Sequence, residues 1–136
     1  MKEHSFSFGT ASVLAPDLAE IIVNEGVIMT KAMVTEYHDW IEQELADPCM
    51  LLINKVNAYT YEFEAQTRLA TIPKIQAMAV VSYTRASTGT TQLLNKFPRS
   101  QPWNLQIFSS RDDALRWLDH QRKKAKIISA NPDEMP

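Results

Sequence analysis

Cys49 and three histidines are the first side chains to consider for chemistry. Cys49 is the single cysteine of the sequence, so neither an internal disulfide nor a multi-cysteine metal site can form. It begins an apolar run, where a buried structural thiol is favoured over a reactive thiolate. His4, His38 and His120 have no His or Cys partner at ligand spacing. We therefore expect neither a metal site nor a cofactor.

The sequence contains neither a phosphate-binding loop nor a recognisable acid–base pair. The sequence has three glycines, and Gly89 stands alone among hydroxyl residues, so no phosphate-cradling fingerprint is present. Asp112 and Asp113 fall at an expected helix start, where the helix dipole explains two carboxylates. Nucleophilic catalysis needs a base beside the nucleophile, and no such pair can be assembled. We expect the protein not to be an enzyme.

Two polar stretches remain as candidates for binding or regulation. The first contains Asn57, Tyr59, Thr60 and Tyr61, between an expected strand and an expected helix. A phosphate on Thr60 would meet the positive end of that helix; alternatively, Asn57 and Thr60 simply form the turn and cap while the tyrosines pack. The second stretch begins at Arg85, which could pair with an anion or belong to a solvated loop.

The elements that must position these residues follow from hydrophobic periodicity. The run that starts at Cys49 has no solvated face, which is typical of a strand covered by helices on both sides. We expect strands over 5–13, 18–23, 49–53, 77–83 and 103–108, and helices over 30–45, 61–72, a third one capped within 87–91 that buries Leu93, Leu94 and Phe97, and 110–124.

The order of these elements predicts an α/β fold with a mostly parallel sheet of about five strands and four helices. The turn after the Cys49 strand would lie at the carboxyl edge of a central strand, where ligands usually bind. His38 is expected on the polar face of its helix. Residues 1–126 are expected to form one domain and residues 127–136 a flexible tail.

Composition narrows the class of partner. The net charge of −2 provides no basic face for nucleic acid. No apolar stretch approaches the roughly 20 residues that cross a bilayer, so no transmembrane segment is expected. The first residues lack the apolar core of a signal peptide, which favours a cytoplasmic protein.

The C-terminal part carries a family resemblance. Residues 107–118, Ile-Phe-Ser-Ser-Arg-Asp-Asp-Ala-Leu-Arg-Trp-Leu, form a strand, a polar stretch and an acidic helix start. Together with Gly26 before a Thr-capped helix and the Leu51-Leu52-Ile53 strand, they resemble the STAS fold of bacterial SpoIIAA-like proteins, also described as STAS/SEC14 domains. The resemblance covers about 6–121. Antagonists of this type carry a phosphorylated serine in an Asp-Ser-Ser-Gly-like turn, which here reads Ala-Tyr-Thr-Tyr-Glu.

The resemblance implies a non-enzymatic regulatory or protein-interaction module, similar to anti-sigma-factor antagonists but lacking the phosphoserine motif. A regulatory protein partner would bind the strand-exit edge near Tyr59 and Tyr61, whose rings suit such a surface. A homodimer through the expected edge strand with Phe6 and Phe8 is a further expectation, since unpaired strand edges invite pairing.

The alternative function is a small-molecule or lipid-binding domain, as the SEC14 part of the resemblance implies. Its support in the sequence is a group of adaptable apolar side chains, Met29, Met33, Met78 and Phe63. They could line a pocket between helix and sheet.

Overall fold

The computed structural model describes residues 2–96 and 103–130, the last six of these by their backbone alone. The described strands are β1 (Lys2–Ser5), β2 (Gly9–Ala15), β3 (Leu18–Val23), β4 (Ile28–Met29), β5 (Cys49–Lys55), β6 (Thr60–Tyr61), β7 (Ile75–Ser82) and β8 (Leu105–Phe108). The described helices are α1 (Lys31–Glu44), α2 (Phe63–Arg68), α3 (Arg85–Asn95) and α4 (Arg111–Ala130).

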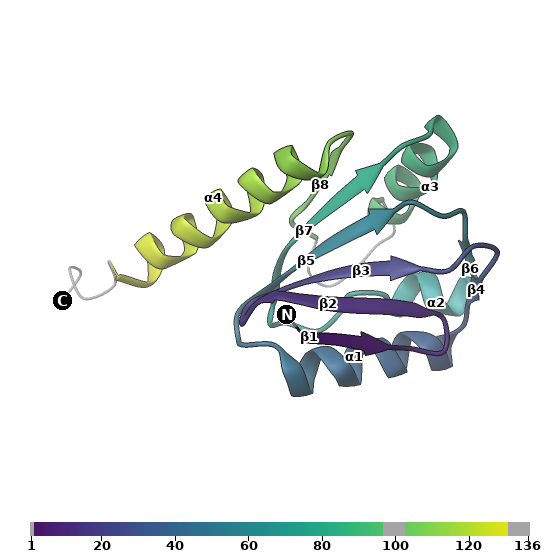
Figure 1. Ribbon diagram of the computed structural model, residues 1–136, viewed down its shortest axis with the longest axis horizontal. Coiled ribbons are helices and arrows are strands. Elements are labelled where there is room, and N and C mark those ends of the chain that lie inside the picture. Colours follow the sequence, from purple (N-terminus) through teal and green to yellow (C-terminus); the bar gives the residue numbers. More distant parts are fainter. Residues whose placement is uncertain (1, 97–102, 131–136) are drawn as a thin grey trace.

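The main sheet is mixed and has six strands in the order β1-β2-β3-β5-β7-β8 (Figure 1). The pairs β1–β2 and β2–β3 are antiparallel, whereas β3–β5, β5–β7 and β7–β8 are parallel. The α/β class is confirmed, but a mostly parallel sheet of about five strands is not. The difference arises at Phe6, whose N–H donates to the carbonyl of Gly9 and turns the chain back.

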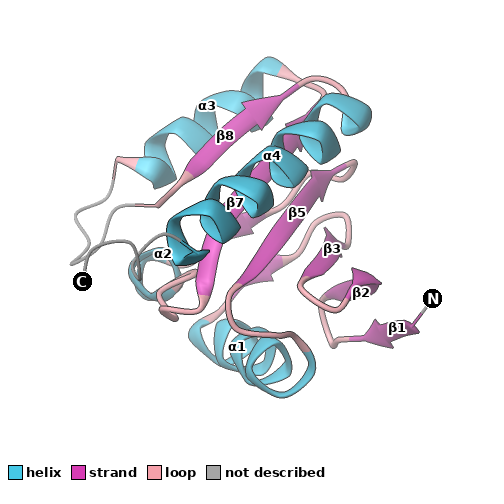
Figure 2. Ribbon diagram, turned by 90° about the vertical axis from the view of Figure 1, so that its left-hand side faces the viewer, coloured by secondary structure: helices cyan, strands magenta, loops and turns pink. Residues whose placement is uncertain are grey.

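Helices cover the sheet on both faces (Figures 1 and 2). α1, α2 and α3 lie on one face, and α4 packs on the other, mainly over β7. Strand β5 lies between them and serves both layers: Leu51 belongs to the α1 side, and Met50 and Leu52 to the α4 side. Burial on both faces explains why β5 is an almost continuous apolar run.

Phe6 and Phe8 lie in the turn between β1 and β2 and are buried beneath α1. Their rings stack with centroids 4.8 Å apart, and both meet Tyr37 edge-on. The expectation that they lie within a half-buried edge strand is therefore wrong, because neither residue belongs to a strand. One edge of the sheet is β1, all four residues of which are exposed.

The predicted N-caps of α1 and α4 are confirmed, and the predicted N-cap of α3 is wrong. Thr30 caps α1 as expected, since its hydroxyl accepts from the N–H of Met33 at 3.2 Å. The cap of α3 is Thr84 instead of the later hydroxyl run. That run lies inside the helix, where Thr88 and Thr91 donate to carbonyls one turn back. Ser110 accepts from the N–H of Asp113 at the start of α4, as predicted.

Two element lengths also differ from the prediction. α2 spans six residues, because Tyr61 belongs to β6 and the helix begins at Phe63. α4 continues to Ala130, four residues into the segment expected to be irregular. The remainder of that segment, 131–136, and Phe97 lie outside the described residues.

Candidate functional site

A cleft opens at the carboxyl end of the parallel strands, the edge at which the sequence predicts binding. Its volume is about 600 Å³. The walls come from the segments that follow β3, β5 and β7 and from the first turns of α3. The lining residues are Glu25, Gly26, Val27, Lys55, Val56, Asn57, Ala58, Tyr59, Thr60, Tyr83, Thr84, Ala86, Ser87 and Thr90.

The small parallel ribbon of β4 and β6 supports the part of the cleft wall that contains Thr60. Ile28 pairs with Thr60 and Met29 with Tyr61. Next to the ribbon, the N–H of Gly26 donates to the carbonyl of Ala58 at 2.7 Å. Gly26 has a φ of 78°, a conformation that glycine adopts without strain. The ribbon fixes the segment that carries Tyr59.

Lys55 ends the central strand β5 and lies at the bottom of the cleft. Leu51, Ile53 and Lys55 alternate along the strand, so the lysine shares the face that packs toward α1–α3. The residue is 8% exposed. It lines both the cleft and a smaller apolar cavity beneath it, as Tyr59 also does. These two residues therefore lie where the cleft and the apolar cavity meet.

The apolar cavity has a volume of about 40 Å³, enough for about three water molecules. Apolar side chains from the sheet, α1 and α3 surround it, and polar atoms contribute little to its wall. Met29 and Met78 line this cavity, as the ligand-binding alternative requires. Met33 does not line it, and Phe63 is 73% exposed.

The Lys55 amine has no hydrogen bond or ion pair with any residue that the structure describes. Its nitrogen lies over two aromatic rings instead, 5.0 Å from the centre of Tyr59 and 5.8 Å from that of Tyr61. Burial lowers the pKa of this amine from 10.5 to about 8, because the charged form is poorly solvated. At pH 7 about one-tenth of the amine is therefore neutral.

Three tyrosines surround the amine and the cavity. The Tyr61 hydroxyl donates to that of Tyr59 at 3.3 Å. The Tyr37 hydroxyl is buried and has no hydrogen-bond partner within the described chain, and the same holds for the Ser87 hydroxyl at the cleft. Burial raises the pKa of Tyr59 to about 12 and raises the pKa values of Tyr61 and Tyr37 well above their usual range, so all three phenols stay protonated.

A second polar cluster lies on the opposite face of the sheet, where α4 begins. Glu20 accepts two hydrogen bonds from the guanidinium of Arg111, at 2.7 and 3.1 Å, and one from Asn54 at 2.9 Å. The Tyr83 hydroxyl donates to Asn54 at 2.8 Å. Bonding to Arg111 lowers the pKa of Glu20. These paired contacts dock the start of α4 against β3 and β5.

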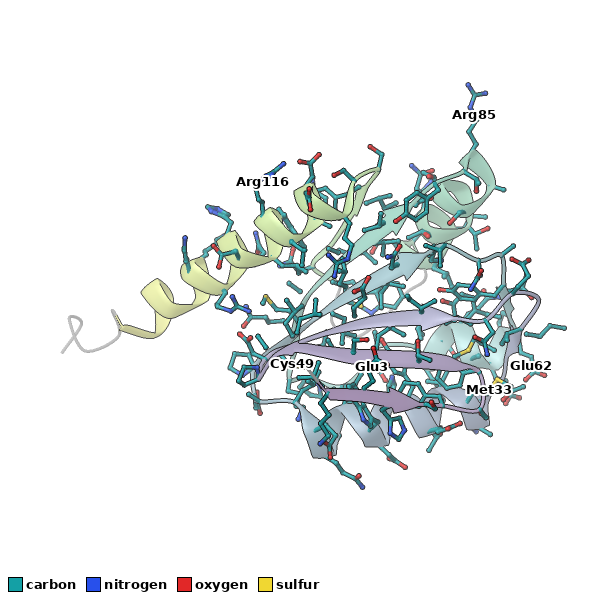
Figure 3. All side chains as sticks on the ribbon, viewed as in Figure 1. Glu3, Met33, Cys49, Glu62, Arg85 and Arg116 are labelled. Atoms are coloured by element: carbon teal, nitrogen blue, oxygen red, sulfur yellow. The ribbon has the colours of Figure 1, made fainter. Side chains whose placement is uncertain are left out.

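The residues predicted from the sequence are divided between several places. Asn57, Tyr59 and Thr60 line the cleft, whereas Tyr61 faces the apolar cavity. Thr60 pairs in β6 and does not begin a helix, so the expected helix dipole is absent from it. Arg85 points away from the body of the protein, at the outer end of α3 (Figure 3).

Sequence reasoning missed Lys55, Tyr37 and His38. His38 is buried, contrary to the polar position expected for it, and its Nε2 accepts from the N–H of Ala70 at 3.0 Å. Lys55 could have been found from the alternation of Leu51, Ile53 and Lys55, which places an amine on an inward face. No comparable signal marks His38, since its burial depends on the segment after α2.

Cys49 lies in the interior of the protein, at the start of β5. The Cys49 thiol is fully buried, and burial raises its pKa to about 11, which suits a structural role. The described residues contain no group of three His, Cys, Asp or Glu side chains placed to hold a metal ion. Within the same residues, no helix is both long and apolar enough for a membrane span.

Comparisons with protein-family models, with curated proteins and with solved structures gave no match for this chain. The function must therefore be argued from the site itself.

Proposed function

We propose that the protein is a binding domain for a small molecule that combines a short apolar group with a polar head. The observation that carries this proposal is the position of Lys55, between the open cleft and the apolar cavity, without a charged partner in the described chain. The proposed function corresponds to the small-molecule-binding alternative predicted from the sequence. The SpoIIAA-like identity of the fold and a cytoplasmic, non-enzymatic role remain parts of the proposal.

A buried amine without hydrogen bonds does not stabilise a fold. Removing an ammonium group from water is unfavourable unless new partners replace the water. Lys55 gains two aromatic rings but no acceptor among the described residues. A polar group of a ligand in the cleft would supply that acceptor. The unpartnered hydroxyls of Tyr37 and Ser87, at the cavity and at the cleft, are two further groups that a ligand could satisfy.

The size of the two spaces limits the ligand. The cavity of about 40 Å³ accepts an apolar group of a few carbon atoms, and the cleft of about 600 Å³ accepts a larger polar part. A long acyl chain would need side chains around the cavity to move. We therefore favour a short amphipathic molecule over a membrane lipid.

Methionine methyl groups provide a direct test by NMR. Met29 and Met78 line the cavity, and Met50 lies on the α4 side of the sheet with 1% exposure. Titration with butan-1-ol should shift the Met29 and Met78 signals and saturate, and should leave Met50 unchanged. Equal shifts at all three methyls, or none at any, would contradict the proposal. Val80→Ile, which adds a methyl group at the cavity wall, should weaken the binding.

A second candidate is the regulatory protein interaction that the STAS resemblance implies. Exposed apolar side chains support it, because Ile28 is 58% and Phe63 is 73% exposed beside the β4–β6 ribbon. If a protein partner binds there, Ile28→Asp should abolish its co-purification from the native host. Leu93→Asp is the matched control, since Leu93 is 65% exposed on α3. Retention of every partner by Ile28→Asp would exclude this surface.

A further inference from the structure

We infer that Lys55 forms a reversible imine with a ligand that carries an aldehyde or ketone group, at the boundary between the cleft and the apolar cavity. This inference deepens the proposed function and rests on it, because it specifies the chemistry of the polar head.

The backbone of Lys55 is held rigidly, and the residue lies between the cleft and the apolar cavity. Its backbone lies in β5, which is hydrogen-bonded to β7 through residue 55 itself, opposite Ser82. The side chain reaches the wall of both the cleft and the cavity. A carbonyl carbon could therefore approach the amine from the cleft while its apolar substituent enters the cavity. Such a fixed approach favours attack on a bound carbonyl.

The surroundings leave the amine nucleophilic. Two aromatic rings, of Tyr59 and Tyr61, face it at 5.0 and 5.8 Å, and both phenols are neutral. Among the described residues that line the cleft, the carboxylate is Glu25, which accepts from the N–H of Ala58 at 3.0 Å. With no carboxylate paired to it, the amine loses its proton readily: burial lowers its pKa to about 8. Desolvated lysines of this kind serve as Schiff-base nucleophiles.

Lys74 is a second largely buried lysine, and its contacts indicate a structural role. Its side chain is 10% exposed, close to the burial of Lys55. Its ammonium donates to the carbonyls of Glu42 and Leu45, at 3.1 and 2.7 Å, and lies 3.8 Å from the Glu42 carboxylate. Lys74 thus ties α1 to the start of β7. Lys55 has none of these contacts, so packing alone does not account for its amine.

The covalent step balances without an oxidant or a reductant. The Lys55 ammonium first loses a proton to solvent in the cleft. The nitrogen lone pair attacks the carbonyl carbon, a C–N bond forms, and the carbonyl oxygen takes up a proton to give a carbinolamine. Loss of the hydroxyl group and one amine hydrogen as water leaves the C=N bond. Water returns through the cleft to hydrolyse it, which makes the capture reversible.

Reductive trapping tests the inference. The full-length protein is incubated at pH 7 with butanal and sodium cyanoborohydride, and the butylated lysines are located by peptide mass spectrometry. Lys55 should be modified at least about tenfold faster than exposed Lys31, because burial lowers the pKa of the Lys55 amine and the cavity holds the aldehyde beside it. Its rate should saturate with butanal concentration, as expected for a binding site. Lys74 is the buried control and should react most slowly.

The outcomes separate this inference from the proposed function. Preferential and saturable modification of Lys55 supports the imine. If Lys55 reacts no faster than Lys31 while butan-1-ol still shifts Met29 and Met78, the imine is excluded and the binding function stands. If butan-1-ol causes no shift and Lys55 is not trapped, both are excluded.

Discussion

The amine of Lys55 lies 5.0 Å from the centre of the Tyr59 ring, and this contact is part of the barrier between the cleft and the apolar cavity. A cation over an aromatic face is stabilised by about 0.5–2 kcal/mol. The fall in the pKa of Lys55 from 10.5 to about 8 corresponds to about 3 kcal/mol against the charged form. On these figures the rings offset only part of the burial penalty, so we expect Lys55 to lower the stability of the protein.

Replacing Lys55 with methionine should stabilise the protein. Methionine keeps much of the apolar chain and removes the buried charge, so the free energy of unfolding at pH 7 should rise by about 1–3 kcal/mol. Denaturation by urea at pH 7 measures this, with Lys31→Met as the exposed control, expected within about 0.5 kcal/mol of the parent protein. A clear loss of stability in Lys55→Met would show that the amine has a stabilising contact.

The gain from Lys55→Met should also depend on pH. The pKa of Lys55 is about 8 when folded and 10.5 when unfolded, so the unfolded state binds more protons between these values. Stability of the parent protein then rises with pH through this window. The advantage of Lys55→Met is complete below pH 8 and should shrink as the pH approaches 10.5. A pH-independent difference between the two proteins would contradict burial as the cause.

His38 predicts a second pH dependence, in the acid range. Its neutral Nε2 accepts a hydrogen bond from the N–H of Ala70. Ala70 has a φ of 53°, in the left-handed region, and this hydrogen bond helps to hold it there. Burial lowers the pKa of His38 from 6.5 to about 4. The stability that this shift provides is fully present above pH 6.5, declines as the pH falls below 6.5, and is gone once the pH has passed through 4. Between pH 7.5 and 5 the loss should be about 2 kcal/mol.

Denaturation of the parent protein and of His38→Gln at several pH values checks this. Glutamine can still accept a hydrogen bond but does not titrate, so the variant should lose much less stability between pH 7.5 and 5. His120→Gln changes an exposed histidine in α4 and serves as the control. If the parent and His38→Gln lose stability in parallel, protonation of His38 is not the cause.

The pair formed by Glu20 and Arg111 should contribute more than the pair formed by Asp113 and Arg116. Arg111 holds Glu20, a buried carboxylate that is 9% exposed, with two hydrogen bonds. Arg111→Ala should lower the free energy of unfolding by about 1–3 kcal/mol, since it leaves that carboxylate with fewer partners. Arg116→Ala, in the same helix and with an exposed partner, should cost less than about 0.5 kcal/mol. Equal effects in chemical denaturation would contradict the role given to Glu20.

The parts of the fold that the sequence could predict are those in which both faces of an element are buried. The run from Cys49 and the run 77–83 lack a solvated face, and both are confirmed as parallel strands, β5 and β7. The N-terminal strand was predicted less well, because the turn at Phe6 depends on burial of that ring against Tyr37 and Trp40. Contacts so distant along the chain leave no mark on local periodicity.

The candidate site could likewise be predicted only in part from the sequence. Parallel strands bring their carboxyl ends to one edge, so Asn57, Tyr59 and Thr60 could be placed at the cleft from topology alone. Lys55 was missed because a lysine at a strand end is ordinarily solvated, and its burial depends on Tyr59 and Tyr61 folding back over it. The site therefore arises from the return of β6 alongside β4, a pairing of two residues that no sequence pattern indicates.

Gly9 and Gly89 should respond to alanine in opposite directions. A Cβ at Gly9 would lie 2.1 Å from the Ile22 carbonyl oxygen and 2.9 Å from the Val23 Cα, both backbone atoms of β3. Gly9→Ala must separate β2 from β3 and should lower the free energy of unfolding by about 3 kcal/mol. Gly89 lies inside α3 with open space around its Cα, so Gly89→Ala should raise it by about 0.5–1 kcal/mol. Urea denaturation of both variants measures the contrast, and a Gly9→Ala protein as stable as the parent would show that the two backbones do not approach this closely.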